Sequence, residues 1–316
     1  MTTAQTIDAR TGQHAFPNVG RVEMTHHFIE VRGTTLHVAE AGQGEPLLLI
    51  HGYPQHWWVW RRVIPHFAGE RRVICPDLRG FGWSDAPPDG PYDKESLVDD
   101  VIALLDQLEV GEVDVVGHDW GGWISYLLGM KYPERVKRIV ALSIMHPFQK
   151  PTLRLLGNLW HIWHGQLLGL PGIGVWAARP DSTAGRLIVR WLGAGTWTKE
   201  ERRIFLGQFD DPARRLATHR LYQAVRKVDM PRVLRGHWRR TRLQVPTRLI
   251  VGRRDPCLLP NRPDELKRYA PKLELKRVEA AHAVLEEQGE RVLALIDEFL
   301  DGPMERALSR NGVEGS

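Results

Sequence analysis

The sequence predicts an α/β fold with a mostly parallel central sheet and an inserted helical lid. Between residues 28 and 146, short and nearly continuous apolar runs alternate with helix-like segments; these runs are "PLLLIHG", "RRVICPD", "VDVVGHD" and "RIVALSI". Such runs are typical of parallel strands that are buried on both faces. The alternation resumes after residue 246, whereas residues 147–246 lack strand-like runs. One α/β domain with a helical insertion explains this order.

The elements follow one another in a readable order. "FIEVR" and "TLHVAEAG" predict a hairpin around Gly33, and "KESLVDDVIALLDQLEV" predicts a helix closed by Gly111. After the insertion, "PTRLIVG" and "LELKRVE" predict strands, while "NRPDELKRYA" and "GERVLALIDEFL" predict helices.

These elements divide the chain into an N-terminal extension, a core, a cap and a tail. We expect the extension at 1–24, the core at 25–146 and 247–300, the helical cap domain at 147–246 and a flexible C-terminal tail at 301–316. Roughly the first twenty residues are expected to be loosely ordered.

The composition is that of an ordinary soluble globular protein. Of its 316 residues, 42% are hydrophobic and 26% charged. No run of 18 apolar residues occurs, so no transmembrane segment is predicted. The two cysteines, Cys75 and Cys257, have neither metal-like spacing nor a disulfide framework, which favours a cytoplasmic location.

Charge is distributed unevenly. Residues 147–246 carry 18 lysines and arginines against 6 acidic residues. This basic segment is either a solvated face or a surface for an acidic partner or a membrane. No nucleic-acid motif accompanies it, so no nucleic-acid partner is expected. A basic, tryptophan-rich lid could also pair two copies of the chain, which leaves a homodimer among the expectations.

The stretch "VGHDWGGW" predicts a strand, a sharp turn and a helix. In the turn G-x-S-x-G, the middle residue is a nucleophilic serine, and here that position is Asp119. Gly117 and Gly121 supply the small flanking positions that such a turn needs. The simpler alternative is that Asp119 caps the helix N-terminus.

"HGYP" follows a predicted buried strand, at the sheet end where ligands bind. The backbone N–H of Tyr53 could point into a pocket and be joined there by that of Trp120. Two convergent donors form an oxyanion hole. An ordinary Gly-Pro turn is the alternative.

Asp255 and His282 follow the last two predicted strands. The order nucleophile, acid, histidine is that of the α/β-hydrolases. A carboxylate on one ring nitrogen holds the histidine tautomer while the other nitrogen activates water. Taken singly, either residue could belong to an ordinary loop.

The segments "HGYPQHWWVW", "DLRGFGWSD", "GHDWGG" and "AH…EEQGERV" resemble the α/β-hydrolase family, and within it the epoxide hydrolase and haloalkane dehalogenase branch. The resemblance covers roughly residues 25–300 and is weaker in the lid. An aspartate is already ionised at pH 7 and can attack an electrophilic sp³ carbon to form an alkyl ester. His282 would then activate water for the hydrolysis of that ester.

Epoxide hydrolases usually present two lid tyrosines to the epoxide oxygen. The resemblance places Tyr222 at the second position and His164, a departure from tyrosine, at the first. Both residues could instead be lid packing residues. We expect Trp120, Trp163 and Leu168 to line an apolar substrate pocket, although indoles are more often core.

The sequence therefore predicts an epoxide hydrolase that converts an apolar epoxide and water into a vicinal diol. No cofactor and no metal are implied. A haloalkane dehalogenase is the first alternative, because it uses the same aspartate nucleophile. A ligand-binding protein without turnover is the alternative from another class.

Overall fold

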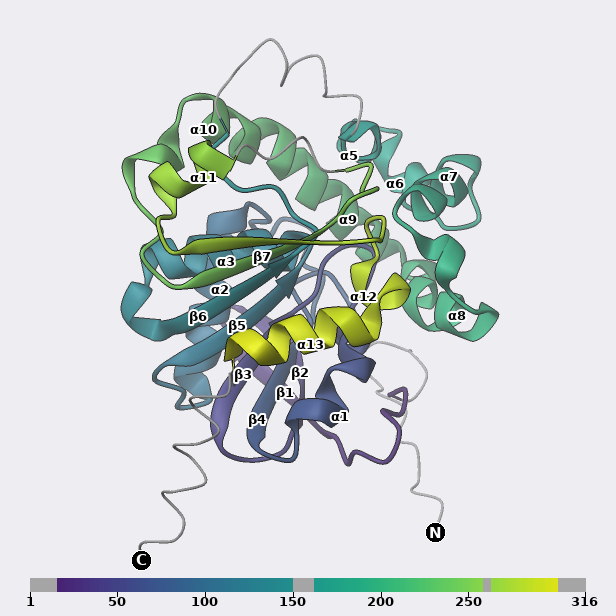
Figure 1. Ribbon diagram of the computed structural model, residues 1–316. Coiled ribbons are helices and arrows are strands. Elements are labelled where there is room, and N and C mark those ends of the chain that lie inside the picture. The colour runs from purple at the N-terminus through teal and green to yellow at the C-terminus, as the bar shows by residue number, and fades with distance from the viewer. Residues whose placement is uncertain (1–15, 150–161, 258–262, 301–316) are drawn as a thin grey trace, which may run out of the picture.

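One eight-stranded sheet runs through the computed structural model of the protein, which describes residues 16–149, 162–257 and 263–300 (Figure 1). The strand order is β1-β2-β4-β3-β5-β6-β7-β8. β1 and β2 pair as the expected antiparallel hairpin, β2 pairs antiparallel with β4, and the other neighbours are parallel. The strand bounds are β1 Thr25–Val31, β2 Thr34–Ala41, β3 Glu45–Ile50, β4 Arg71–Pro76, β5 Val113–His118, β6 Val136–Leu142, β7 Thr247–Gly252 and β8 Leu273–Val278. The predicted α/β class with a mostly parallel sheet is confirmed.

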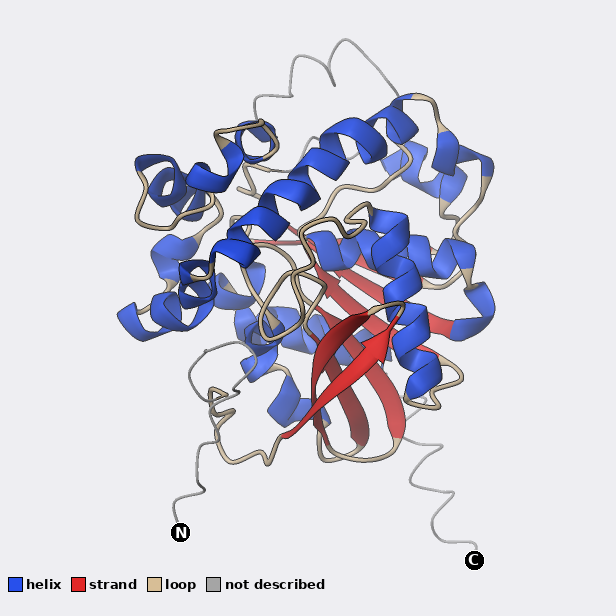
Figure 2. Ribbon diagram, turned by 180° about the vertical axis from the view of Figure 1, so that it is seen from behind, coloured by secondary structure: helices blue, strands red, loops and turns tan. Residues whose placement is uncertain are grey.

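Helices cover both faces of this sheet (Figures 1 and 2). α2 (Lys94–Gln107), α3 (Trp120–Lys131) and α11 (Pro263–Tyr269) pack on one face. α1 (Ile64–Phe67) and α13 (Gly289–Leu300) pack on the other. Successive residues of a strand point to opposite faces, so Leu48 belongs to one core and Leu49 to the other.

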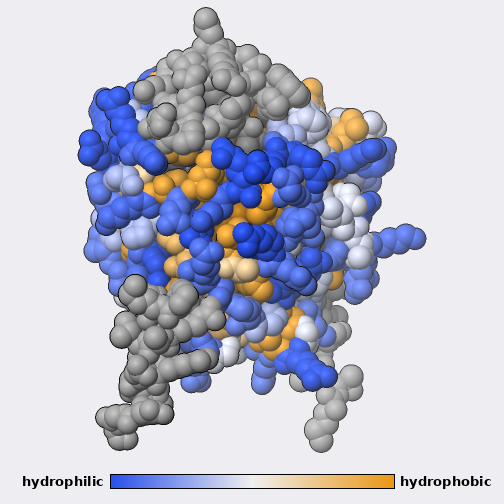
Figure 3. Space-filling view, viewed as in Figure 1, coloured by the Kyte–Doolittle hydropathy of each residue, from blue (hydrophilic) through white to orange (hydrophobic). Residues whose placement is uncertain are grey.

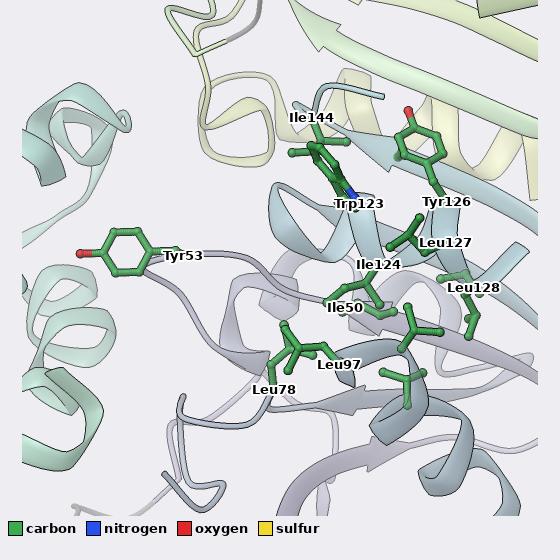
Figure 4. Close-up of a cluster of buried hydrophobic side chains, with 14 of the residues drawn as sticks. Ile50, Tyr53, Leu78, Leu97, Trp123, Ile124, Tyr126, Leu127, Leu128 and Ile144 are labelled. Carbon is green, nitrogen blue, oxygen red and sulfur yellow. The ribbon is translucent and has the colours of Figure 1, made fainter. Parts of the chain in front are cut away.

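Figure 4 shows the first of these cores at the centre of the domain. Ile50, Leu97 and Ile124 meet there between the sheet and the two helices α2 and α3. The ring of Tyr53 points away from this group toward the helices of the insertion, where it packs on Tyr222 with ring centroids 5.4 Å apart. The loop after β3 therefore places Tyr53 between this core and the helices of the insertion.

Two local expectations are wrong. Helix α2 ends at Gln107, and the left-handed residue after it is Glu109 (φ 55°) rather than Gly111. The end of the N-terminal extension is also more ordered than expected, because Phe16 stacks on His26 with ring centroids 3.7 Å apart. Asn18 is held as well, since its carbonyl accepts a hydrogen bond from the Trp58 indole N–H at 3.0 Å. Residues 1–15 and the predicted tail 301–316 lie outside the described residues.

Helices fill the described part of the chain between β6 and β7 and lie over the carboxyl ends of the parallel strands (Figure 1). Their bounds are α5 Trp163–Leu168, α6 Gly174–Ala177, α7 Thr183–Trp191, α8 Lys199–Gly207, α9 Pro212–Ala224, the π-helical η6 Val225–Asp229 and α10 Met230–Leu234. The same insertion also contains the short 3₁₀ turns η4 Ala194–Thr196, η5 Gln208–Asp210 and η7 His237–Arg240. The core has similar turns, η1 Trp57–Arg62 and η2 Pro133–Arg135, and the short helix α12 Val284–Glu287.

The face of the molecule in Figure 3 is mainly hydrophilic, with hydrophobic residues in a strip across its middle. Within the described ranges, no helix combines the length and the apolar character needed to cross a bilayer.

Candidate active site

Asp119 lies on the sharp turn between β5 and α3. Its backbone has φ 51° and ψ −122°, a conformation that non-glycine residues rarely adopt and that costs free energy. The turn closes because Gly117 and Gly121 have no side chains: a Cβ at Gly117 would meet the carbonyl of Gly121, and one at Gly121 the carbonyl of Ile50. The Asp119 side chain makes no helix-capping hydrogen bond, which weakens the helix-cap interpretation.

Two backbone amides hold the Asp119 carboxylate. Tyr53 N–H donates to Oδ2 at 2.9 Å, and the amide of Trp120 also hydrogen bonds to this side chain. Burial raises the pKa of Asp119, while His282 and the two amides act in the opposite direction. The two predicted oxyanion-hole donors therefore both bind the carboxylate of the predicted nucleophile.

His282 lies between the predicted nucleophile and the predicted acid, in the loop between β8 and α12. Its Nδ1 is 3.0 Å from Asp255 Oδ2, and its Nε2 is 3.8 Å from Asp119 Oδ1. Burial alone would lower the pKa of His282, but the Asp255 carboxylate and then that of Asp119 outweigh it and raise the pKa to about 9. The three predicted residues thus meet in one buried cluster.

Neighbouring groups that the sequence reasoning missed fix the loop of His282. The carbonyl of His282 lies 3.3 Å from His118 Nε2, and the other ring nitrogen of His118 is 3.1 Å from Gln55 Oε1. The Glu287 carboxylate accepts the N–H of Ala281 with both oxygens at 3.0 Å. The contacts of His118 join residues far apart in the chain, so no local pattern indicates them.

The two lid candidates lie beside each other above the turn. Tyr222 on α9 is buried, and its Oη accepts a hydrogen bond from the Trp120 indole Nε1–H at 3.4 Å. Burial and then the charge of Asp119 raise the pKa of Tyr222 well above its usual value, which keeps the phenol protonated. The ring of His164 on α5 packs edge-on against Tyr222 with centroids 6.2 Å apart. Burial and the nearby His282 lower the pKa of His164 to about 3, so its imidazole is neutral.

The predicted pocket residues differ in their surroundings. Trp120 is half-buried and contacts Tyr222, so it lines the site directly. Trp163 is half-buried and packs edge-on against Trp191 and His164. Leu168 is fully buried in the core, with its carbonyl 2.9 Å from the Nδ1 of a cap histidine, His219.

A buried ion pair behind Trp120 is also absent from the sequence reasoning. Lys94 opens α2 and Asp229 ends η6, and their Nζ and Oδ2 atoms lie 3.7 Å apart. The ammonium of Lys94 lies over the Trp120 ring, 4.2 Å from its centroid. The only hint in the sequence was a lysine at a helix start, where acidic residues are usual.

In the described part of the chain, one group of three side chains has the composition of a possible metal site. Ligand atoms of Asp255, Cys257 and His282 lie within 4.8 Å of one another. Two of these side chains already share a hydrogen bond, and burial raises the pKa of the Cys257 thiol well above its usual value. This arrangement suits a proton relay better than a metal site, because metals bind thiolates.

A carboxylate at the nucleophile position, an acid and a histidine at the carboxyl ends of parallel strands, in that chain order, define the α/β-hydrolase class. The model of the alpha/beta hydrolase fold family matches residues 45–166. The chain is 31% identical over 283 residues to the AB hydrolase superfamily protein YfhM of Bacillus subtilis (strain 168), a match that spans 86% of this chain and 96% of that protein. The protein therefore belongs to the α/β-hydrolase superfamily.

Other similar proteins are epoxide hydrolases by name. The chain is 42% identical over 123 residues to the soluble epoxide hydrolase of Corynebacterium sp. (strain C12), a match that covers 39% of this chain but only 43% of that relative's length. The solved structure of potato (Solanum tuberosum) epoxide hydrolase I is similar with a TM-score of 0.76 and 25% identity, over 88% of this chain and 99% of that one.

Proposed function

We propose that the protein is an epoxide hydrolase that converts an apolar epoxide and water into a vicinal diol through a covalent ester on Asp119. The observation that carries this proposal is an aspartate at the nucleophile turn, with His282 on one side and the protonated phenol of Tyr222 from the insertion close by. The similar proteins named epoxide hydrolases support the same reaction.

In the first half-reaction, Asp119 Oδ1 attacks a ring carbon of the epoxide and the carbon–oxygen bond of the ring breaks. Oδ2 remains on the Tyr53 amide, so the carboxylate is oriented for attack through its other oxygen. Tyr222 gives its phenolic proton to the oxygen that leaves the carbon, and Trp120 Nε1–H supports the phenolate that results. His164 is placed to assist as the second oxygen-binding residue.

In the second half-reaction, water attacks the ester carbonyl. Ester formation removes the charge of Asp119, which is one of the three carboxylates that raise the pKa of His282, with those of Asp255 and Glu287. The histidine can then release its proton to bulk water, become neutral and take a proton from the attacking water through Nε2, while Asp255 holds Nδ1. The tetrahedral oxyanion develops on Oδ2, which already accepts the Tyr53 amide, while the amide of Trp120 also binds the Asp119 side chain. His282 returns its proton to the departing diol oxygen, and the carboxyl proton of Asp119 restores Tyr222. Once Asp119 is ionised again, His282 regains from bulk water the proton that it released.

The haloalkane dehalogenase alternative is less well supported. That reaction needs N–H donors for the departing halide, and the indole N–H of Trp120 instead points to the Tyr222 oxygen. A phenol above the nucleophile serves an epoxide oxygen, which needs a proton; a halide does not.

We also propose a reducing compartment, the cytoplasm, as its location. Cys75 and Cys257 are both buried free thiols, and they share no disulfide.

Trapping of the ester tests the proposed function. His282→Ala removes the base, so exposure to an aryl epoxide is expected to add the full epoxide mass to the intact protein. The control variant His282→Ala/Asp119→Asn is expected to gain nothing. Mass gained only from a bromoalkane, equal to the alkyl group without halogen, would replace the proposal by dehalogenation. A folded protein without either adduct would favour a binding protein.

A further inference from the structure

Lys94 and Asp229 form an ion pair inside the protein, where charges are costly. The Lys94 side chain is fully buried and that of Asp229 nearly so, and the 3.7 Å between Nζ and Oδ2 is longer than a hydrogen bond. Lys94 belongs to the core helix α2, whereas Asp229 belongs to the π-helical turn between α9 and α10. Single π-helical turns inside α-helices occur frequently at functional sites.

The ammonium has a second neighbour that belongs to the site. Lys94 Nζ lies 4.2 Å from the centroid of the Trp120 ring, in the position of a cation–π contact. The same indole donates its Nε1–H to Tyr222 Oη. A chain of contacts thus leads from Lys94 through Trp120 to the proposed proton donor, with Asp229 at its far end.

A cation over the face of an indole draws electron density from the ring and makes the N–H a stronger hydrogen-bond donor. In a buried site, linked polar contacts reinforce one another, because water does not screen them. The stronger donor favours the phenolate of Tyr222 over the neutral phenol. The strengthened indole N–H therefore stabilises Tyr222 at the step in which the phenol gives up its proton.

We propose that Lys94 is a positioning residue for epoxide ring opening: its ammonium polarises the Trp120 indole and so stabilises the phenolate that Tyr222 becomes as it protonates the epoxide oxygen. Asp229 holds the ammonium in place. This inference rests on the proposed function.

Three carboxylates surround Lys94 and favour its ammonium over the neutral amine. Burial outweighs those of Asp229, Asp119 and Asp93, so the pKa of Lys94 is lowered on balance, and burial raises the pKa of its partner Asp229.

A purely structural role is the rival explanation, because the ion pair also ties the insertion to the core. The rate of ester formation separates the two, measured by intact mass against time with an aryl epoxide in a His282→Ala background. Lys94→Met is expected to slow ester formation about tenfold, or about 1.4 kcal/mol. Lys94→Arg restores most of the rate, because it keeps a cation that stacks on indoles.

A second variant guards against a folding defect. Lys94→Met/Asp229→Asn removes both buried charges, which proteins often tolerate when both partners are replaced. It is expected to fold and to remain about as slow as Lys94→Met. A rate equal to that of the parent in this folded double variant would overturn the inference.

The decisive comparison is a double-mutant cycle with Tyr222→Phe. Without the phenol, Lys94→Met is expected to slow ester formation less than twofold, since Lys94 acts through Tyr222. An equal slowing with and without the phenol would establish the structural role and refute the inference. If Tyr222→Phe slows ester formation and Lys94→Met does not, the inference fails and the proposed function stands. If the His282→Ala parent forms no ester, or Tyr222→Phe leaves its rate unchanged, the proposed function fails and the inference with it.

Discussion

The pKa of His282 is expected to fall when Asp119 loses its charge. The proposed mechanism depends on this fall, because a histidine with a pKa of about 9 is protonated at neutral pH and cannot act as a base. Asp119→Asn imitates the charge of the ester intermediate, since an amide is neutral and has nearly the shape of a carboxylate.

The structure sets the size of the fall. His282 Nε2 and Asp119 Oδ1 lie 3.8 Å apart. Two unit charges at that distance attract by about 1 kcal/mol in water and by about 4 kcal/mol at an effective dielectric constant of about 20. At about 1.4 kcal/mol per pKa unit, Asp119→Asn should lower the pKa of His282 by about one to three units.

Nuclear magnetic resonance of protein labelled at the histidine ring carbons measures this pKa directly. The signal of His282 is assigned by its loss in His282→Ala. His146 serves as the internal control, because burial alone lowers its pKa to about 4 and the substitution should leave it unchanged. A His282 pKa that stays near 9 in Asp119→Asn would refute the reasoning, because the base would then remain protonated after the ester has formed.

Four further outcomes are expected. The raised pKa of His282 stabilises the fold fully below the unfolded value of 6.5, and this contribution is lost as the pH rises through about 9. The shift corresponds to about 3 kcal/mol in the free energy of unfolding. The difference in this free energy between the wild type and His282→Gln, measured by urea unfolding, should therefore shrink toward high pH. Asp255→Asn should slow ester hydrolysis by about 10³–10⁴-fold in single-turnover kinetics and let the ester accumulate; unchanged hydrolysis would remove Asp255 from its role. Tyr222→Phe should slow ring opening by about 10²–10⁴-fold while the hydrolysis step keeps its rate, and an equal loss in both steps would contradict an acid role. Gly121→Ala should destabilise the fold by about 1–3 kcal/mol, because its Cβ would meet the carbonyl of Ile50, and a thermal midpoint equal to that of the wild type would contradict this packing.

The local patterns of the sequence predicted the fold class well. Buried parallel strands need continuous apolar runs, and "PLLLIHG" and "VDVVGHD" became β3 and β5 with little change. Helix ends were less predictable. The sequence predicts that α2 ends at Gly111, yet the helix ends at Gln107 and Glu109 adopts the left-handed conformation.

The N-terminal segment shows why an ordered segment is hard to predict when its contacts come from the tertiary structure. Its residues 16–20 carry no periodic pattern, so the sequence predicts loose order there. In the structure the ring of Phe16 stacks on His26, a contact made possible only once β1 and β2 have paired.

By itself, the sequence determined the parallel sheet and the places of Asp119, Asp255 and His282 after its strands. These features are local: strand periodicity and turn glycines lie within a few residues of what they specify, and parallel strands bring their carboxyl ends to one edge. Only the tertiary structure decided which side chains from distant elements touch. Trp120 meets Tyr222 across 102 residues and Lys94 meets Asp229 across 135, because the packing of the insertion on the core sets those contacts, and no local pattern encodes that packing.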